Sequence, residues 1–145
     1  MQAVVLIGGK GTRLRPITYD VPKEPMLNHV PRATKVEKPW GKFEQYTFNQ
    51  KSTVKIITVA PDGMLSSQYH FERDELWVVL DDGARVELDG EVLHPQPQEK
   101  IFIPRQTTHR LSAVGNKSVR VLEISFGEFD EKDMVRLEDA YGRTG

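Results

Sequence analysis

Short apolar runs separated by turn residues dominate the chain from residue 40 onward. Residues 76–80 form a continuous apolar run, residues 84–88 alternate strictly between apolar and polar, and residues 118–126 alternate again. Asp81-Asp82-Gly83, between the first two runs, is typical of a hairpin turn. Because many short strands with regularly spaced turns build packed or closed sheets, this pattern predicts an all-β sandwich or barrel.

One short helix is expected at the end of the chain. Asp130 is a suitable N-cap, and acidic residues follow it in what would be the first turn. Met134, Leu137 and Tyr141 recur at helical spacing and would form the packing stripe of this helix. Gly142 would end it.

The first forty residues have a different pattern. Residues 3–7 are a continuous apolar run that leads into the glycine-rich residues 8–16, as in a buried strand that enters a phosphate-binding loop. Proline residues and the lack of any period are typical of a linker, which we place at residues 32–39.

Composition and charge limit the classes of function that the chain can have. With 145 residues the chain is expected to hold one principal domain, and its net charge of -1 lacks the basic bias of a nucleic-acid-binding protein. The absence of cysteine excludes disulfides and thiolate metal ligands and fits a cytoplasmic location. No apolar run reaches the length of a membrane span. A small-molecule ligand, with no nucleic acid and no membrane, is therefore expected.

Four polar residues could form a metal site. Gln68 and His70 are two residues apart, so that in a strand both side chains would point to the same face. Glu75 follows after a short irregularity, and His109 lies far along the chain. An amide oxygen, two imidazoles and a carboxylate on one concave face would bind a divalent ion such as Zn, Mn, Fe, Co or Ni. The alternative is that each is an ordinary strand residue, at the surface or satisfied in the core.

Three motifs in residues 38–143 resemble the cupin superfamily and, within it, the type II mannose-6-phosphate isomerase domain. Residues 38–41, Lys-Pro-Trp-Gly, are similar to the opening of that domain. Residues 68–77, with the pattern Gln-x-His-x-x-Arg-x-Glu-x-Trp, resemble its first cupin motif, and Pro104 and His109 fit the second. Residues 133–143, ending in Tyr-Gly-Arg, resemble its C-terminal signature. The resemblance implies a cupin barrel, a double-stranded β-helix or jelly roll, at residues 40–145.

A separate resemblance covers residues 1–31. Residues 8–16 are similar to the signature of a sugar nucleotidyltransferase, and residues 22–26 to its Pro-Lys-Pro element, with Glu24 inserted. Such an enzyme needs several βα units, and about thirty residues supply one. We therefore expect a truncated nucleotidyltransferase-like segment, with a residual anion site at residues 8–13 as the alternative. In this family the isomerase domain often follows a mannose-1-phosphate guanylyltransferase.

The cupin resemblance implies a metal-dependent aldose–ketose isomerase that interconverts mannose 6-phosphate and fructose 6-phosphate through an enediol. The ion would be held by Gln68, His70, Glu75 and His109. The candidate catalytic residues are Arg73 and Glu72. Arg73 matches an arginine of the motif, whereas Glu72 is chosen by its location alone. The other interpretation of Glu72 is a solvated charge in a hairpin. The cations expected to bind the substrate phosphate are Lys100, Arg105, Arg110, Arg136 and Arg143.

Two alternatives to the isomerase stay open. The family usually has histidines where this sequence has Phe71, Glu72 and Leu76. If any of those histidines moves a proton or binds substrate, the chain would be a non-catalytic metal-binding cupin that holds a sugar phosphate or sugar nucleotide. An interaction protein without a metal is the other alternative. A homodimer is expected, because exposed sheet edges invite pairing.

Overall fold

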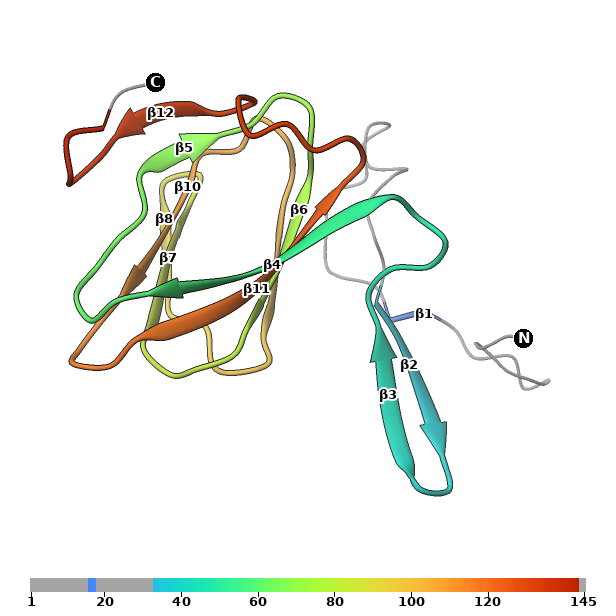
Figure 1. Ribbon diagram of the computed structural model, residues 1–145. Helices are drawn as coiled ribbons and strands as arrows, with labels where there is room; N and C mark the ends of the chain where they lie inside the picture. The colour runs from blue at the N-terminus through green and yellow to red at the C-terminus, as the bar shows by residue number, and fades with distance from the viewer. Residues whose placement is uncertain (1–15, 18–32, 144–145) are drawn as a thin grey trace. The chain divides into compact units, whose positions relative to one another are not determined.

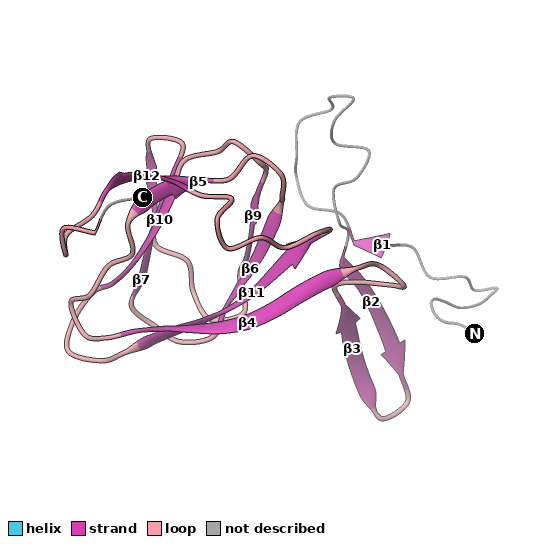
Figure 2. Ribbon diagram, turned by 45° about the horizontal axis from the view of Figure 1, so that its top comes forward, coloured by secondary structure: helices cyan, strands magenta, loops and turns pink. Residues whose placement is uncertain are grey.

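The computed structural model of the chain describes residues 16–17 and 33–143. The chain divides into two compact units, residues 1–50 and residues 51–145. All regular secondary structure of the described residues is β-strand, as Figure 2 shows. None of these residues forms a helix that could cross a membrane. The larger unit carries the candidate site.

The smaller unit contains an antiparallel sheet of strands β1 (Pro16–Ile17), β2 (Ala33–Lys38) and β3 (Gly41–Gln45). Strands β2 and β3 form a hairpin. Most of the expected linker, residues 32–39, is therefore strand, because pairing satisfies backbone groups that a linker leaves to water. The predicted boundary at residue 40 falls within this hairpin. The predicted nucleotidyltransferase motifs lie almost wholly outside the described residues.

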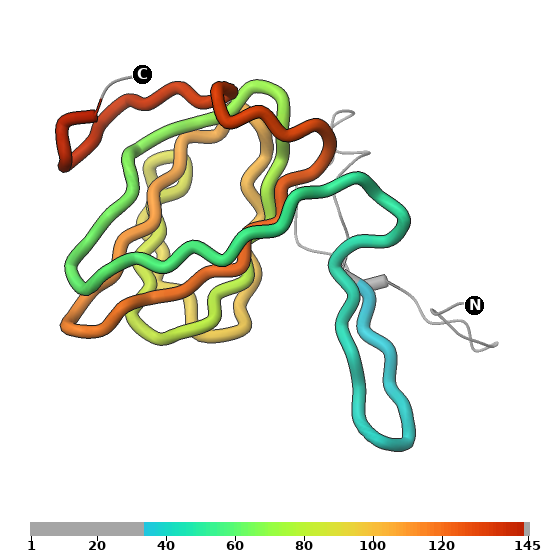
Figure 3. The backbone as a smooth tube through the Cα atoms, in the orientation of Figure 1, coloured from blue at the N-terminus to red at the C-terminus, as the bar shows by residue number. Residues whose placement is uncertain are grey.

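Residues 51–145 form two antiparallel sheets that enclose a barrel (Figures 1 and 3). The first sheet has the order β4-β11-β6-β9, and its strands are β4 (Ser52–Val59), β6 (Glu75–Val79), β9 (Lys100–Ile103) and β11 (Val119–Phe126). The second has the order β12-β5-β10-β7-β8, and its strands are β5 (Ser67–Tyr69), β7 (Ala84–Leu88), β8 (Glu91–Leu93), β10 (His109–Ala113) and β12 (Val135–Glu138).

The hydrophobic core lies between the two sheets. Trp77 and Val79 of β6 face Val86 and Leu111 of the other sheet, and all four are almost completely buried. Full burial of such side chains contributes roughly 1.5–3 kcal/mol each to folding. The alternation expected over residues 84–88 is present, since Ala84 and Val86 are buried and Arg85 between them faces away from the core. The all-β prediction is confirmed.

The expected C-terminal helix is wrong. Residues 135–138 form strand β12, which pairs with β5. Asp130 does cap a turn, because its Oδ1 accepts the Lys132 N–H at 2.9 Å, but the turn does not continue. Val135 and Leu137 alternate with polar residues, so the segment also has a strand period, and the edge of β5 offers backbone partners that favour the strand.

Candidate metal centre

Glu75 is a buried carboxylate at the start of β6. The alternation of this strand turns Glu75 to the same face as Trp77, into the barrel, where it is 1% exposed. Its Oε2 accepts a hydrogen bond of 2.8 Å from Arg73 Nε. Its Oε1 has no hydrogen-bond partner among the described residues. An unpartnered buried acceptor is costly, so this oxygen could be a metal ligand.

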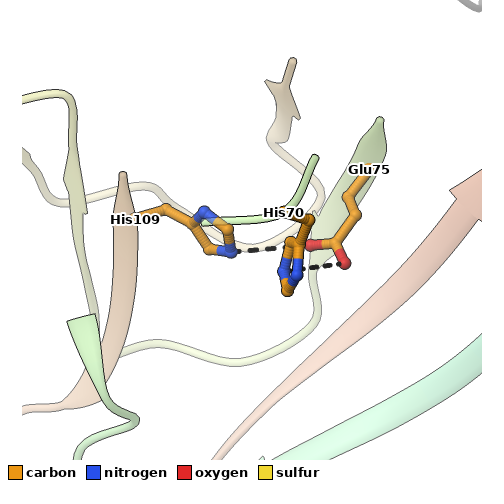
Figure 4. A group of neighbouring side chains, drawn as sticks. All are labelled: His70, Glu75 and His109. Carbon is orange, nitrogen blue, oxygen red and sulfur yellow. Dashed lines mark ion pairs between the residues drawn. The ribbon is translucent and has the colours of Figure 1, made fainter. Parts of the chain in front are cut away.

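Two buried histidines face this carboxylate (Figure 4). His109 begins β10, and its Nε2 lies 3.7 Å from Glu75 Oε1. His70 follows β5, and its Nε2 lies 3.4 Å from Glu75 Oε2. The ligand atoms of the three residues all lie within 4.8 Å of one another. The structure thus brings together three of the four residues that the sequence pattern predicts as metal ligands.

The hydrogen bonds of both rings fix the tautomer that a metal ligand needs. His70 Nδ1 lies 2.7 Å from the Asp133 carbonyl oxygen, and His109 Nδ1 lies 2.8 Å from that of Thr107. A carbonyl oxygen can only accept, so each Nδ1 carries the hydrogen and each Nε2 presents its lone pair. Burial lowers the pKa of His109 to about 4 and also lowers the pKa of His70, which keeps both rings neutral at pH 7.

Gln68 lies on the same inner face as His109. In the register of β5 and β10 the two residues are direct partners, so their side chains project to the same side of the sheet. On the other side of β5, Gln68 pairs with Arg136 of β12. Arg136, Gln68 and His109 therefore form a row across three neighbouring strands at the end of the barrel that holds Glu75.

Arg73 positions the ligands of this site. It is 4% exposed, and besides its bond to Glu75 its Nη1 donates to the Asp130 carbonyl oxygen at 3.0 Å. Its Nη2 lies 3.4 Å from His70 Nε2, and its guanidinium lies over the ring of Phe129, 4.5 Å from the centroid. These contacts hold the guanidinium against Glu75, so Arg73 orients a candidate metal ligand in this structure, and its catalytic role stays a prediction.

Asp133 ties the C-terminal segment to the loop that carries His70. Its two carboxylate oxygens accept the backbone N–H groups of Phe71 and Glu72, each at 2.9 Å. Burial by itself would raise the pKa of Asp133, but these N–H groups and nearby positive charge hold it below its ordinary value. With the carbonyl bond to His70, this one residue fixes three groups of the loop.

Glu123 is an inner-face carboxylate that the sequence prediction missed. It pairs with Trp77 in the register of β11 and β6, and its Oε2 accepts the Trp77 indole N–H at 3.1 Å. Burial, with the added charge of Glu75, raises the pKa of Glu123 to about 7. Ser125, the register partner of Glu75, is also buried there, and its Oγ has no partner among the described residues. The sequence signal was a glutamate at an inward position of the alternating run 118–126.

The cations expected to bind phosphate do not gather at the site. Arg136 shares its inner face, and its Nε donates to Ser66 Oγ at 3.2 Å. Lys100 pairs with Val78, whose side chain points away from the side of Trp77, so Lys100 lies on the outer face of its sheet. Arg110 alternates with His109 and pairs with Glu138 at 3.2 Å, on the outer face of the other sheet.

The remaining predicted site residues lie in loops. Arg105 donates its backbone N–H to Asp74 Oδ1 at 2.7 Å, and its side chain is 39% exposed. Arg143 is paired with Asp139 at 2.7 Å on the surface. Glu72 is exposed and uses its backbone N–H in the contact with Asp133. Glu72 lies between His70 and Glu75 in the sequence, but its side chain faces solvent.

Comparison with known proteins establishes the family. Residues 27–139 match the family described as mannose-6-phosphate isomerase C-terminal. The chain belongs to this family. It is 40% identical over 111 residues to the xanthan biosynthesis protein XanB of Xanthomonas campestris pv. campestris, covering 76% of this chain and 24% of that protein. It is 41% identical over 110 residues to the mannose-1-phosphate guanylyltransferase ManC of Salmonella typhimurium, covering 75% and 23%. The chain thus spans about a quarter of the length of these curated relatives.

Solved structures confirm the cupin fold. The capsular polysaccharide assembling protein CapF of Staphylococcus aureus matches with a TM-score of 0.55 and 17% identity, over 74% of this chain and 32% of that chain. The cupin domain of Schizosaccharomyces pombe Cnp3 matches with a TM-score of 0.50 and 10% identity, over 68% and 88%. At these identities the likeness shows the fold alone.

The side chains at this end of the cupin barrel fit a divalent metal ion. The set offers two neutral imidazole nitrogens and a carboxylate oxygen that lacks a partner, with a glutamine on the same face. Imidazole and carboxylate ligands suit Mn, Fe, Co, Ni and Zn. His70, Glu75 and His109 are therefore a group that could hold such an ion.

Removing the Asp133 carboxylate should weaken metal binding. The Asp133→Ala variant loses the two bonds from the Phe71 and Glu72 N–H groups, while the bond of its backbone carbonyl to His70 stays. We expect the dissociation constant for Mn²⁺ to rise roughly 10–100-fold, the usual effect of losing a group that orients a metal ligand. Titration calorimetry measures it. Asp139→Ala, a matched change in the same segment, should bind as the wild type does, and equal affinity of both variants would contradict the assigned role.

The raised pKa of Glu123 predicts a pH-dependent stability of the chelator-treated protein. Its pKa of about 7 exceeds the ordinary value of 4.5, so the folded state binds the proton more tightly. This contribution is full below pH 4.5 and is lost as the pH rises through 7. The stability of the wild type relative to Glu123→Gln should fall by on the order of 2 kcal/mol from about pH 5 to 8 in urea unfolding. Glu91→Gln, at an exposed position, should show no such trend, and a pH-independent difference for Glu123→Gln would refute the assignment.

Proposed function

We propose that the barrel is a metal-dependent aldose–ketose isomerase domain that interconverts mannose 6-phosphate and fructose 6-phosphate through an enediol. The observation that carries this proposal is Glu75 Oε1, buried and unpartnered among the described residues, facing the free Nε2 lone pair of His109. The family supports the substrate class. His70, Glu75 and His109, with Gln68, would hold the ion.

The reaction moves a proton between C1 and C2 of the sugar. When bound, a divalent ion supplies Lewis-acid stabilisation of the charge that develops on O1 and O2. Arg73 holds Glu75 in place, and the depth of the two histidines keeps bulk water from the ligands. Glu72 remains a proposed proton carrier by its place in the loop of His70. Glu123 is a second candidate, because it lies inside the barrel beside Glu75.

Arg136 is the best placed of the cations expected from the sequence to bind phosphate. It stands on the inner face in the same row as Gln68 and His109, at the edge strand of the sheet. Lys100 and Arg110 lie on outer faces, and Arg105 and Arg143 are engaged by aspartates in loops. Among these cations Arg136 is therefore the one that shares a face with Gln68 and His109.

A non-catalytic metal-binding cupin that holds a sugar phosphate is the second candidate. Phe71 and Glu72 stand where the family usually has histidines, in the loop beside His70. If one of those histidines carries the proton in the family, this chain lacks it at that place. Leu76 gives no such support. It alternates with Glu75 and Trp77 and points to the outer face, where it is fully buried, so a histidine at that position could not reach the ligands.

A coupled assay for fructose 6-phosphate tests the proposal. Protein loaded with Mn²⁺, Co²⁺, Zn²⁺ or Fe²⁺ in turn should convert mannose 6-phosphate with at least one of them. His109→Ala should lose the metal and lower the rate at least about 100-fold, because removing a ligand opens the site. His94→Ala, an exposed histidine after β8, should keep both. Protein that binds metal and mannose 6-phosphate but turns nothing over with any ion would establish the binding module instead.

We also propose that the chain forms a homodimer. Strand β4 lies at one edge of its sheet, and its outward residues Val54 and Ile56 are each 57% exposed. A long edge strand with apolar residues invites pairing with a second copy. Light scattering at micromolar concentration should give twice the mass of the chain, and Ile56→Lys should shift it toward the monomer. A monomeric mass for the wild-type protein would contradict the dimer.

A further inference from the structure

Lys55 is a cation on the inner face of the barrel. In the register of β4 and β11 it is the partner of Glu123, which in turn pairs with Trp77 on β6. Direct partners in neighbouring strands project to the same side, so Lys55, Glu123 and Trp77 form one inward row. The next inward residues of β4, Ile57 and Val59, belong to the apolar core. A lysine at an inward position of such a strand requires a partner or a function.

Lys55 is linked to the candidate metal centre through Phe129. Its Nζ lies over the Phe129 ring, 4.2 Å from the centroid, and the Arg73 guanidinium lies over the same ring at 4.5 Å. Arg73 is bonded to Glu75. Lys55 therefore stands one aromatic ring away from the group that positions a candidate metal ligand.

The ion pair of Lys55 is weak enough to be exchanged. Its Nζ lies 3.6 Å from Glu131 Oε2, and the two side chains are 37% and 73% exposed. Exposed pairs of this kind contribute about 0–1 kcal/mol. A phosphate carries more charge than a carboxylate and more acceptor oxygens. The ammonium of Lys55, a compact charge with three donors, could therefore exchange Glu131 for a phosphate at little cost.

Arg73 cannot take this role without disturbing the metal ligands. It is 4% exposed, compared with 37% for the Lys55 side chain, and its Nε is bonded to Glu75 and its Nη1 to the Asp130 carbonyl. Turning its guanidinium toward a phosphate would break both bonds. Lys55 would give up only its ion pair with the exposed Glu131 carboxylate to bind a phosphate.

We propose that Lys55 binds the phosphate of the sugar substrate, with the Phe129 ring as one wall of the subsite. This inference rests on the proposed function, and it adds to it a phosphate ligand on β4. The two cations that contact Phe129 then have different tasks. Arg73 orients Glu75, and Lys55 recognises the anionic end of the substrate.

Binding and turnover of mannose 6-phosphate by the full metal-loaded chain test the proposal together. Lys55→Gln should raise both the dissociation constant from calorimetry and KM by at least about tenfold, the effect of losing one charged hydrogen bond. The metal content should not change, and kcat should change less than KM. Lys55→Arg should restore most of the affinity. Lys117→Gln, the same change in an exposed loop at the opposite end of β10, should leave both constants unaltered.

A second variant tests the exchange of partners. Glu131→Gln removes the carboxylate that competes for Lys55 and should tighten mannose 6-phosphate binding about two- to threefold, as expected for an exposed ion pair. If Lys55→Gln and Lys55→Arg both lose the metal or unfold together, and Glu131→Gln has no effect on affinity, Lys55 is a brace for Phe129 and the assignment is overturned.

The outcomes separate this inference from the proposed function. Wild-type protein that binds mannose 6-phosphate without converting it, with the binding lost in Lys55→Gln, would keep the Lys55 assignment and end the isomerase proposal. Wild-type protein that converts the sugar, with Lys55→Gln equal to it in affinity and KM, would keep the isomerase and overturn the assignment. Wild-type protein that neither binds nor converts it would overturn both.

Discussion

The unbalanced environment of the Glu75 carboxylate is the constraint on which the site depends. One of its oxygens is bonded to Arg73, and the other faces His109 with no hydrogen-bond partner among the described residues. A charge at 1% exposure requires compensation on both oxygens. The neutral histidines supply no positive charge, so a cation held between the three side chains would balance the second oxygen. Each further contact of the site serves to hold these groups in that geometry.

The C-terminal segment belongs to the site although it lies some sixty residues from the first motif. Asp133 binds the loop of His70 by two backbone N–H groups and by the ring Nδ1. Asp130 binds Arg73 through its carbonyl, and Phe129 stacks on the same guanidinium. Strand β12 then pairs with β5, which fixes the segment along the strand that leads into His70.

The sequence predicted the parts of the molecule that depend on local pattern. Alternation over residues 84–88 follows from strand geometry alone and is found in the structure. His70 lies beyond the end of β5 and Glu75 begins β6 in the other sheet, so their approach depends on the packing of the two sheets and not on spacing within one strand. The C-terminal helix was wrong because tertiary pairing with β5 outweighed a local period. Lys100 and Arg110 were chosen by nearness in sequence, yet strand alternation turns them outward. The alternation of residues 118–126 marks Glu123 as inward, but its neighbours Lys55 and Trp77 follow only from the register of β11 with β4 and β6.

A crystal of the protein grown with Mn²⁺, with diffraction data collected at the manganese absorption edge, tests the central claim most directly. The account predicts one anomalous peak inside the barrel, within bonding distance of Nε2 of His70, Nε2 of His109 and Oε1 of Glu75, with Arg73 still bonded to Oε2. The Gln68 amide should face the same peak. No anomalous peak among these side chains at saturating Mn²⁺, or a peak held by other residues, would contradict the account.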